Sequence, residues 1–134
     1  MSLNFAAIGL VAEDLAASLA FYRILGVDVS ADADGPHVET TLPSGVRLMW
    51  DTTDMVRSLD PDWQTPTGSA RTGLCFECGS AAEVDRTYRA LTDAGHHGHL
   101  DPFDAPWGQR YASVRDPDGN GVDLFAWVSS PAGS

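Results

Sequence analysis

The sequence contains no lysine. Its eight basic residues are all arginine and stand against nineteen acidic residues, so the formal net charge is −11 over 134 residues. Affinity for nucleic acid depends on basic side chains that neutralise phosphates, and anionic membrane surfaces attract the same side chains. The charge balance therefore argues against nucleic-acid and membrane partners, and the long-range field favours neutral or cationic small molecules.

Long apolar runs and a basic N-terminal segment are also missing. The apolar run from Phe5 to Ala12 is too short to cross a bilayer, and residues 1–4 lack the positive charge of a secretory signal. We therefore expect a cytoplasmic protein. With 43% apolar and 20% charged residues the composition is that of a globular protein, and the length predicts one domain over residues 1–134.

Cysteine is scarce, and its only two positions form a C-x-x-C motif. Cys75 and Cys78 lie in an apolar strand pattern, where residues three apart point to opposite faces. A thioredoxin-type motif needs a helix N-terminus, and a zinc ribbon needs a second cysteine pair. We therefore predict two ordinary thiols.

The sequence does contain an internal repeat. Asp14 and Ser80, which are 66 positions apart, are typical helix N-cap residues, and each follows a short apolar run. After both, apolar residues recur at spacings of three and four, which predicts an amphipathic helix in each half. Gly26 and Gly95 are placed to end these helices.

Extended segments follow each predicted helix. They are 27–29, 37–42 and 46–50 in the first half, and 98–103, 110–115 and 122–127 in the second. The halves thus cover about 5–51 and 72–128, and a connector over 52–71 holds a turn of helix near 55–59. The predicted fold class is α+β: two βαβββ repeats form a mixed sheet curled around a cavity, with the helices on its outer face.

Three motifs carry a family resemblance: they are IGLVAEDL at 8–15, FYR at 21–23 and RDPDGNGVDL at 115–124. Together with the repeat, they resemble the vicinal oxygen chelate superfamily, which includes glyoxalase I, extradiol dioxygenases and bleomycin-resistance proteins. The runs at 36–39, 47–52, 58–68 and 107–112 look like those of the mitomycin-binding resistance proteins within it. The resemblance implies a small-molecule ligand and a homodimer.

Enzymes of that superfamily hold a divalent metal at four repeat-related strand positions, which fall here on Ala7, Arg47, Gly73 and Asp123. Only Asp123 could bind a metal, whereas a catalytic site normally has three protein ligands. We therefore expect no metal and no cofactor, and we expect Arg47 to pair with Asp123. His97 and His99 would share a strand face, but no carboxylate stands at a matching position beside them.

If Arg47 and Asp123 face the cavity, strand alternation predicts which other residues line that cavity. The candidate ligand-binding residues are Trp107, Tyr111, Ser113, Arg47, Met49, His37, Glu39, Asp123, Phe125 and Trp63. Cys75 and Glu77 share the inner face. Trp50 has the opposite parity and is expected to pack under a helix, and Tyr22 and Tyr88 are expected in the core.

These residues favour a metal-free binding protein of the antibiotic-resistance type, which sequesters a flat aromatic natural product and needs no catalytic residue. The alternative is a lyase- or isomerase-like enzyme of the same fold. It would use Glu39, Glu77 or Asp123 as a general base.

Overall fold

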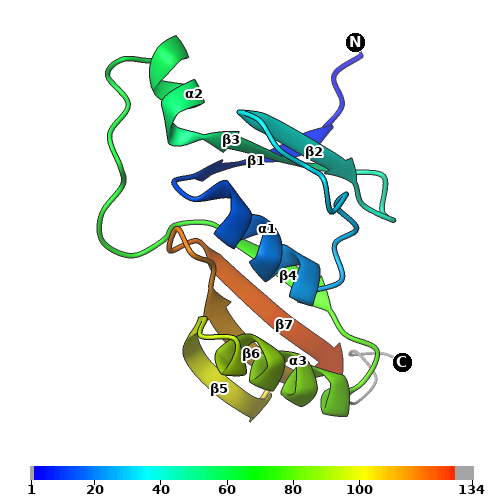
Figure 1. Ribbon diagram of the computed structural model, residues 1–134. Helices are drawn as coiled ribbons and strands as arrows, with labels where there is room; N and C mark the ends of the chain where they lie inside the picture. Colours follow the sequence, from blue (N-terminus) through cyan, green and yellow to red (C-terminus); the bar gives the residue numbers. More distant parts are fainter. Residues whose placement is uncertain (1, 129–134) are drawn as a thin grey trace. The chain divides into compact units, whose positions relative to one another are not determined.

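The computed structural model describes residues 2–128 and divides between Thr67 and Gly68 into two compact units. The division falls inside the predicted connector, and each unit contains one of the predicted repeats (Figure 1). No helix in this described part combines the length and the apolar character needed to cross a membrane. The fold is α+β, as predicted, with one mixed sheet in each unit.

The first unit contains a three-stranded sheet. Its elements are β1 (Ala7–Ala12), α1 (Leu15–Ile24), β2 (His37–Thr41), β3 (Arg47–Thr52) and α2 (Thr53–Leu59). The strand order is β1-β3-β2, with β1 parallel and β2 antiparallel to β3. Helix α2 confirms the predicted turn of helix in the connector.

Helix α1 begins and ends where the sequence indicated. The Asp14 carboxylate accepts a hydrogen bond from the backbone N–H of Ala17, which would otherwise lack a partner at the helix N-terminus. At the other end Gly26 adopts a φ of 88°, a conformation that residues with a Cβ rarely enter.

The core of this unit contains Trp50, which is fully buried. Its indole N–H donates to the Ser18 hydroxyl of α1 at 3.1 Å, and its ring lies edge-on to Tyr22, with centroids 5.7 Å apart. The predictions that Trp50 packs under a helix and that Tyr22 lies in the core are confirmed.

The extended segment 27–29 does not become a strand. The Arg23 side chain donates to the carbonyls of Val29 and Ser30, and the Thr40 hydroxyl donates to the carbonyl of Asp28. Side chains therefore supply hydrogen bonds to this segment, which forms no sheet ladder. The first unit has three strands where four were expected.

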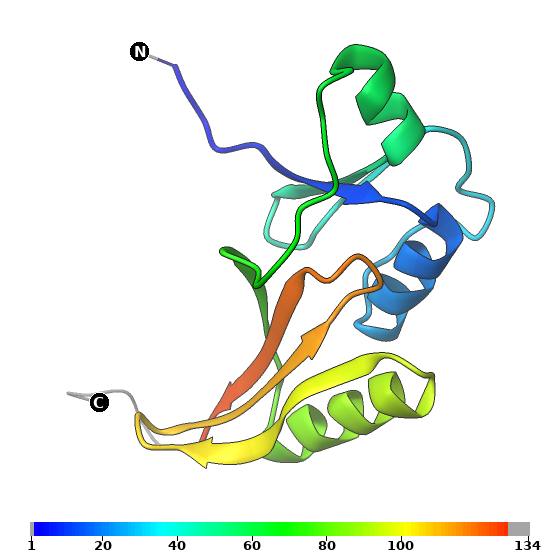
Figure 2. The same ribbon diagram turned by 90° about the vertical axis from the view of Figure 1, so that its left-hand side faces the viewer.

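The second unit contains a four-stranded sheet. Its elements are β4 (Gly73–Glu77), α3 (Ala81–Asp93), β5 (His97–Ala105), β6 (Gln109–Arg115) and β7 (Gly121–Trp127). The order is β4-β7-β6-β5, with only β4 and β7 parallel. Helix α3 lies along one face of this sheet (Figure 2). Val84 and Leu91 of α3 are fully buried, as are Ala112 and Leu124 of the sheet.

Candidate functional site

The face of the second sheet opposite α3 carries the predicted polar residues. Ser113 pairs across the strands with Asp123, and Tyr111 pairs with Phe125. Their neighbours in the chain, Ala112 and Leu124, are fully buried, whereas Asp123 and Phe125 are half-buried. Exposure therefore alternates along β7 as predicted, whereas on β6 Ser113 is itself buried, and only the register places it beside Asp123.

Tyr111 and Asp123 form a direct hydrogen bond on this face. The Tyr111 hydroxyl donates to Asp123 Oδ2 at 2.5 Å. Burial, followed by this bond to a carboxylate, raises the pKa of Tyr111 well above its ordinary value of 10. The phenol therefore stays protonated and remains a hydrogen-bond donor throughout the physiological pH range.

A pocket of about 350 Å³ opens beside this pair. That volume lies at the lower end of the range for small-molecule sites. Its lining residues are Ala70, Arg71, Thr72, Gly73, Leu100, Tyr111, Ser113, Arg115, Gly121 and Asp123. Of the ten predicted ligand-binding residues, the pocket brings together Tyr111, Ser113 and Asp123.

An aromatic cluster adjoins the pocket through Tyr111. The Trp107 ring lies edge-on to Tyr111, with ring centroids 5.6 Å apart. The Phe103 ring is tilted relative to Tyr111, with ring centroids 6.0 Å apart. The Trp107 side chain is 55% exposed, and its indole N–H donates to the Gln109 side chain at 2.6 Å. A ring that is held by a neighbour yet open to solvent can stack on an aromatic ligand.

Sequence reasoning missed Phe103 as a site residue. It lies opposite Tyr111 because β5 shifts register twice relative to β6, between Gly98 and Leu100 and again between Leu100 and Phe103. Regular pairing from Gly98 onward would have put Asp101 opposite Tyr111. Gly98 and Pro102 stand at these two shifts, and glycine or proline inside a strand is a signal of a bulge that could have pointed to Phe103.

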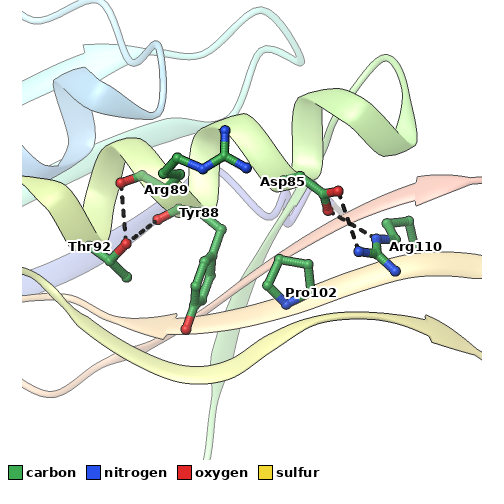
Figure 3. Close-up of a pocket in the computed structure, with 6 residues that line it drawn as sticks. All are labelled: Asp85, Tyr88, Arg89, Thr92, Pro102 and Arg110. Atoms are coloured by element: carbon green, nitrogen blue, oxygen red, sulfur yellow. Dashed lines mark hydrogen bonds and ion pairs between the residues drawn. The ribbon is translucent and has the colours of Figure 1, made fainter.

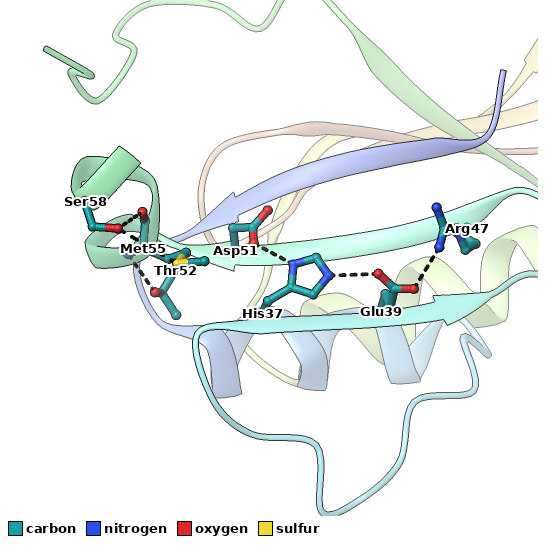
Figure 4. Close-up of polar contacts among 7 residues, drawn as sticks. All are labelled: His37, Glu39, Arg47, Asp51, Thr52, Met55 and Ser58. Atoms are coloured by element: carbon teal, nitrogen blue, oxygen red, sulfur yellow. Dashed lines mark hydrogen bonds and ion pairs between the residues drawn. The ribbon is translucent and has the colours of Figure 1, made fainter. Parts of the chain in front are cut away.

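The first sheet carries a second polar network, shown in Figure 4. His37 contacts two carboxylates: Nδ1 lies 2.6 Å from Asp51 Oδ1, and Nε2 lies 2.8 Å from Glu39 Oε2. Arg47 then donates to the other Glu39 oxygen at 3.0 Å. The bonds to Glu39 and then Asp51 raise the pKa of His37, and the His37 bond lowers the pKa of Glu39.

Arg47 and Asp123 each have a partner within their own unit. Arg47 binds Glu39, and Asp123 accepts the Tyr111 hydroxyl. The pairing of Arg47 with Asp123 stays a prediction. The sheet registers refine one assignment, because Gly9 pairs with Met49 while Cys75, its counterpart 66 positions later, pairs with Asp123. Met49, rather than Arg47, is thus the repeat counterpart of Asp123.

The side chains at the superfamily's metal positions do not fit a divalent cation. Ala7 and Gly73 have no donor atom, Arg47 is a cation, and Met49 offers only a soft thioether. Within residues 2–128, no group of three or more His, Cys, Asp and Glu side chains is arranged to hold a metal ion. The rings of His97 and His99 lie 6.3 Å apart and both residues are exposed.

Trp63 and Tyr88 lie in surroundings that the sequence did not predict. Trp63, in the connector, has the Arg57 guanidinium over its ring, 5.2 Å from the centroid. Tyr88 was expected in the core but is only half-buried, because its hydroxyl reaches outward and donates to Asp101 at 2.6 Å.

Tyr88 instead lines a second pocket, of about 290 Å³, on the α3 side of the sheet (Figure 3). Arg110 crosses this pocket to Asp85, with nitrogen–oxygen distances of 2.9 and 3.3 Å, and it also contacts Asp104 at 3.1 Å. The Arg110 charge is therefore neutralised by two carboxylates of the protein itself.

The two cysteines behave as the strand pattern predicted. Both are free, with Cys75 exposed and Cys78 buried on opposite faces of the strand and its extension. Although Cys75 is exposed as a residue, neighbouring atoms partly desolvate its thiol, and this raises its pKa, as does the negative charge of Asp123. Burial raises the pKa of the Cys78 thiol. Neither thiol has the lowered pKa of a nucleophilic cysteine.

Comparisons with known proteins agree with this architecture. The family described as "Glyoxalase/Bleomycin resistance protein/Dioxygenase superfamily" matches residues 4–124. A crystal structure of a glyoxalase/bleomycin resistance protein/dioxygenase from Nocardioides is 25% identical, with a TM-score of 0.75 over 100% of this chain and 90% of that one.

Two further structures share the fold. A glyoxalase-related enzyme from Fulvimarina pelagi is 21% identical, with a TM-score of 0.78 over 92% of this chain and 87% of its own. A lactoylglutathione lyase from Agrobacterium tumefaciens is 23% identical, with a TM-score of 0.66 over 92% of both chains. No curated protein matches the sequence.

Proposed function

The chain belongs to the glyoxalase, bleomycin resistance protein and dioxygenase superfamily, and from this premise we propose that it is a binding protein that sequesters a small aromatic natural product without a metal. Resistance to a drug of the mitomycin type is the physiological role that this proposal implies. The chain acts as a homodimer, and tight stoichiometric binding lowers the concentration of free drug without a chemical step.

The aromatic cluster beside the pocket carries this proposal. Trp107 is 55% exposed while Tyr111 and Gln109 hold it in place, so little side-chain freedom is lost on binding. Tyr111 also connects the cluster to the polar pair with Asp123. A flat ligand can therefore stack on Trp107 and place a polar group at Asp123.

Isothermal calorimetry with mitomycin-, bleomycin- and quinone-like compounds tests the proposal. We expect saturable binding to the wild type and a loss of tenfold or more in Trp107→Ala, because base- or ring-stacking contacts are worth about 1–3 kcal/mol. Leu59→Ala is the matched control, since Leu59 is 77% exposed and lies in the first unit.

Two results would contradict sequestration. One is that no compound binds the folded wild type. The other is that Trp107→Ala and Leu59→Ala bind equally well.

Catalysis by a carboxylate base is the second candidate, and Asp123 is the residue that favours it. The His37 hydrogen bond lowers the pKa of Glu39 and weakens it as a base. Asp123 faces the pocket with a protonated phenol beside it, an arrangement that can receive and return a proton. Product formation that is lost in Asp123→Asn, with retained binding, would favour the enzyme over the binding protein.

A further inference from the structure

Two arginines line the pocket beside Tyr111 and Asp123. Arg115, at the end of β6, is half-buried, and Arg71 lies in the segment just before β4. The only arginines that form ion pairs within residues 2–128 are Arg47 and Arg110. The pocket therefore holds two guanidinium groups that form no ion pair with a carboxylate of the described residues.

Arg115 is held in place by neutral acceptors. Its Nη1 donates to the Ser113 hydroxyl at 3.3 Å and to the Val114 carbonyl at 3.4 Å. Gly121 lies opposite Arg115 on β7, and a Cβ at Gly121 would lie 3.6 Å from the same Nη1. That distance is an ordinary van der Waals contact, so Gly121 lies directly beside the guanidinium. The printed bonds use only Nη1, which leaves the Nε and Nη2 donors of Arg115 for an anion.

The second pocket provides a comparison within the same unit. There, Arg110 is bound by Asp85 and Asp104, so its donors are already used by the protein. In the Arg71 and Arg115 pocket, the one carboxylate, Asp123, accepts from Tyr111 and forms no ion pair with either arginine. An acidic protein that keeps two arginines without ion pairs in one pocket has a ready site for an anion.

We propose that the ligand of this pocket is an aromatic carboxylate, whose anionic group binds Arg115 and Arg71 and whose ring packs against Tyr111 and Leu100. This inference rests on the proposed sequestration of a small aromatic molecule, and it assigns that molecule a carboxylate in place of the mitomycin-type structure. The long-range field favours neutral or cationic molecules, but the local contacts are with guanidinium groups. A monoanion fits better than a dianion, because Asp123 and the net charge of −11 repel additional negative charge.

The test compares four naphthalene probes that share one ring system, with binding measured by calorimetry. They are 2-naphthoate, 2-naphthamide, 2-naphthyl phosphate and 2-naphthylmethylamine. We expect naphthoate to bind about tenfold or more tighter than the amide, since hydrogen bonds to charged groups are worth about twice those to neutral ones. We expect the phosphate and the amine to bind more weakly than naphthoate.

Three arginine variants locate the binding site. Arg115→Gln and Arg71→Gln are expected to weaken naphthoate binding about tenfold and to leave amide binding unchanged. Arg89→Gln is the matched control, because it removes the same charge from the second pocket. Thermal unfolding of each variant checks that it is folded.

The outcomes separate this inference from the proposed function. If the amide or the amine binds as tightly as naphthoate, or if Arg115→Gln binds naphthoate like Arg89→Gln, the carboxylate assignment is wrong. In that case, loss of binding in Trp107→Ala would still support sequestration. If neither these probes nor the drug-like compounds bind the wild type, both proposals fail.

Discussion

The Tyr111 hydroxyl and the Asp123 carboxylate are joined diagonally across β6 and β7. Asp123 lies directly opposite Ser113, yet it accepts its hydrogen bond, of 2.5 Å, from Tyr111 two residues earlier on the same face. The long phenol spans this diagonal, and a shorter side chain would not. The pair links the aromatic cluster to the polar pocket.

Removing the Tyr111 hydroxyl is expected to cost both stability and affinity. Tyr111→Phe deletes the donor to Asp123, and we expect the free energy of unfolding to fall by about 1 kcal/mol. Tyr88→Phe is the control, since it deletes a comparable bond to Asp101 outside this pocket. Urea unfolding should show similar losses for both variants, whereas calorimetry should show weaker ligand binding for Tyr111→Phe alone. Equal ligand affinities would contradict a role of this hydroxyl in binding.

The His37 network predicts a specific pH dependence of stability. The pKa of His37 is raised above its ordinary 6.5, so its contribution is complete below pH 6.5 and is lost as the pH rises through the raised value. The pKa of Glu39 is lowered from 4.5, so its contribution is present above pH 4.5 and is lost on acidification. The network is therefore most stabilising between about pH 4.5 and 6.5.

Thermal unfolding of the wild type and His37→Gln from pH 4 to 9 measures this effect. The difference in melting temperature should be largest between pH 4.5 and 6.5 and should shrink above it. We expect a small effect, because the His37 side chain is 38% exposed and solvent screens its ion pairs. His97→Gln removes an exposed imidazole from the second unit as a control. A difference that grows with rising pH would show that the assigned contacts are absent.

A methyl group at Gly98 should displace Tyr88. A Cβ there would lie 2.1 Å from the Tyr88 hydroxyl oxygen and 3.1 Å from a Thr92 methyl carbon. The ring must then move and lose its bond to Asp101, so we expect Gly98→Ala to destabilise the protein by about 1–3 kcal/mol in urea unfolding.

Two further variants isolate the Gly98 contact. Gly79→Ala should be nearly neutral, because its Cβ would lie at an ordinary 3.7 Å from the Glu83 carboxylate. Adding Tyr88→Leu to Gly98→Ala should recover part of the loss, because it removes the crowded hydroxyl. Additive losses in the double variant would refute the proposed clash.

The reactivity of Cys75 should report on the charge of Asp123. Cys75 is exposed but its thiol has a raised pKa, so we expect one thiol of the native protein to react with a disulfide reagent, more slowly than free cysteine does. Asp123→Asn removes the negative charge that helps to raise the pKa of Cys75, so the variant should react faster. Asp101→Asn is the control on β5. A rate that is equal in both variants would argue against electrostatic coupling between Asp123 and Cys75.

Local patterning along the chain was enough to predict most elements and their buried faces. The helix bounds could be read directly from the sequence, because helix caps depend only on residues nearby in the chain. Asp14 and Ser80 cap the helix starts, and a glycine follows each helix end. Strand alternation placed Tyr111 and Asp123 on one face because its period does not depend on which strands are neighbours.

The partners of polar side chains depended on contacts between distant parts of the chain. Arg47 binds Glu39, Tyr88 reaches Asp101, and Arg23 and Thr40 donate to backbone carbonyls at 28–30. Register shifts in β5 bring Phe103 to Tyr111. Hydrogen bonds and ring contacts require positions accurate to a few tenths of an ångström, and only the packed sheets and helices set those positions.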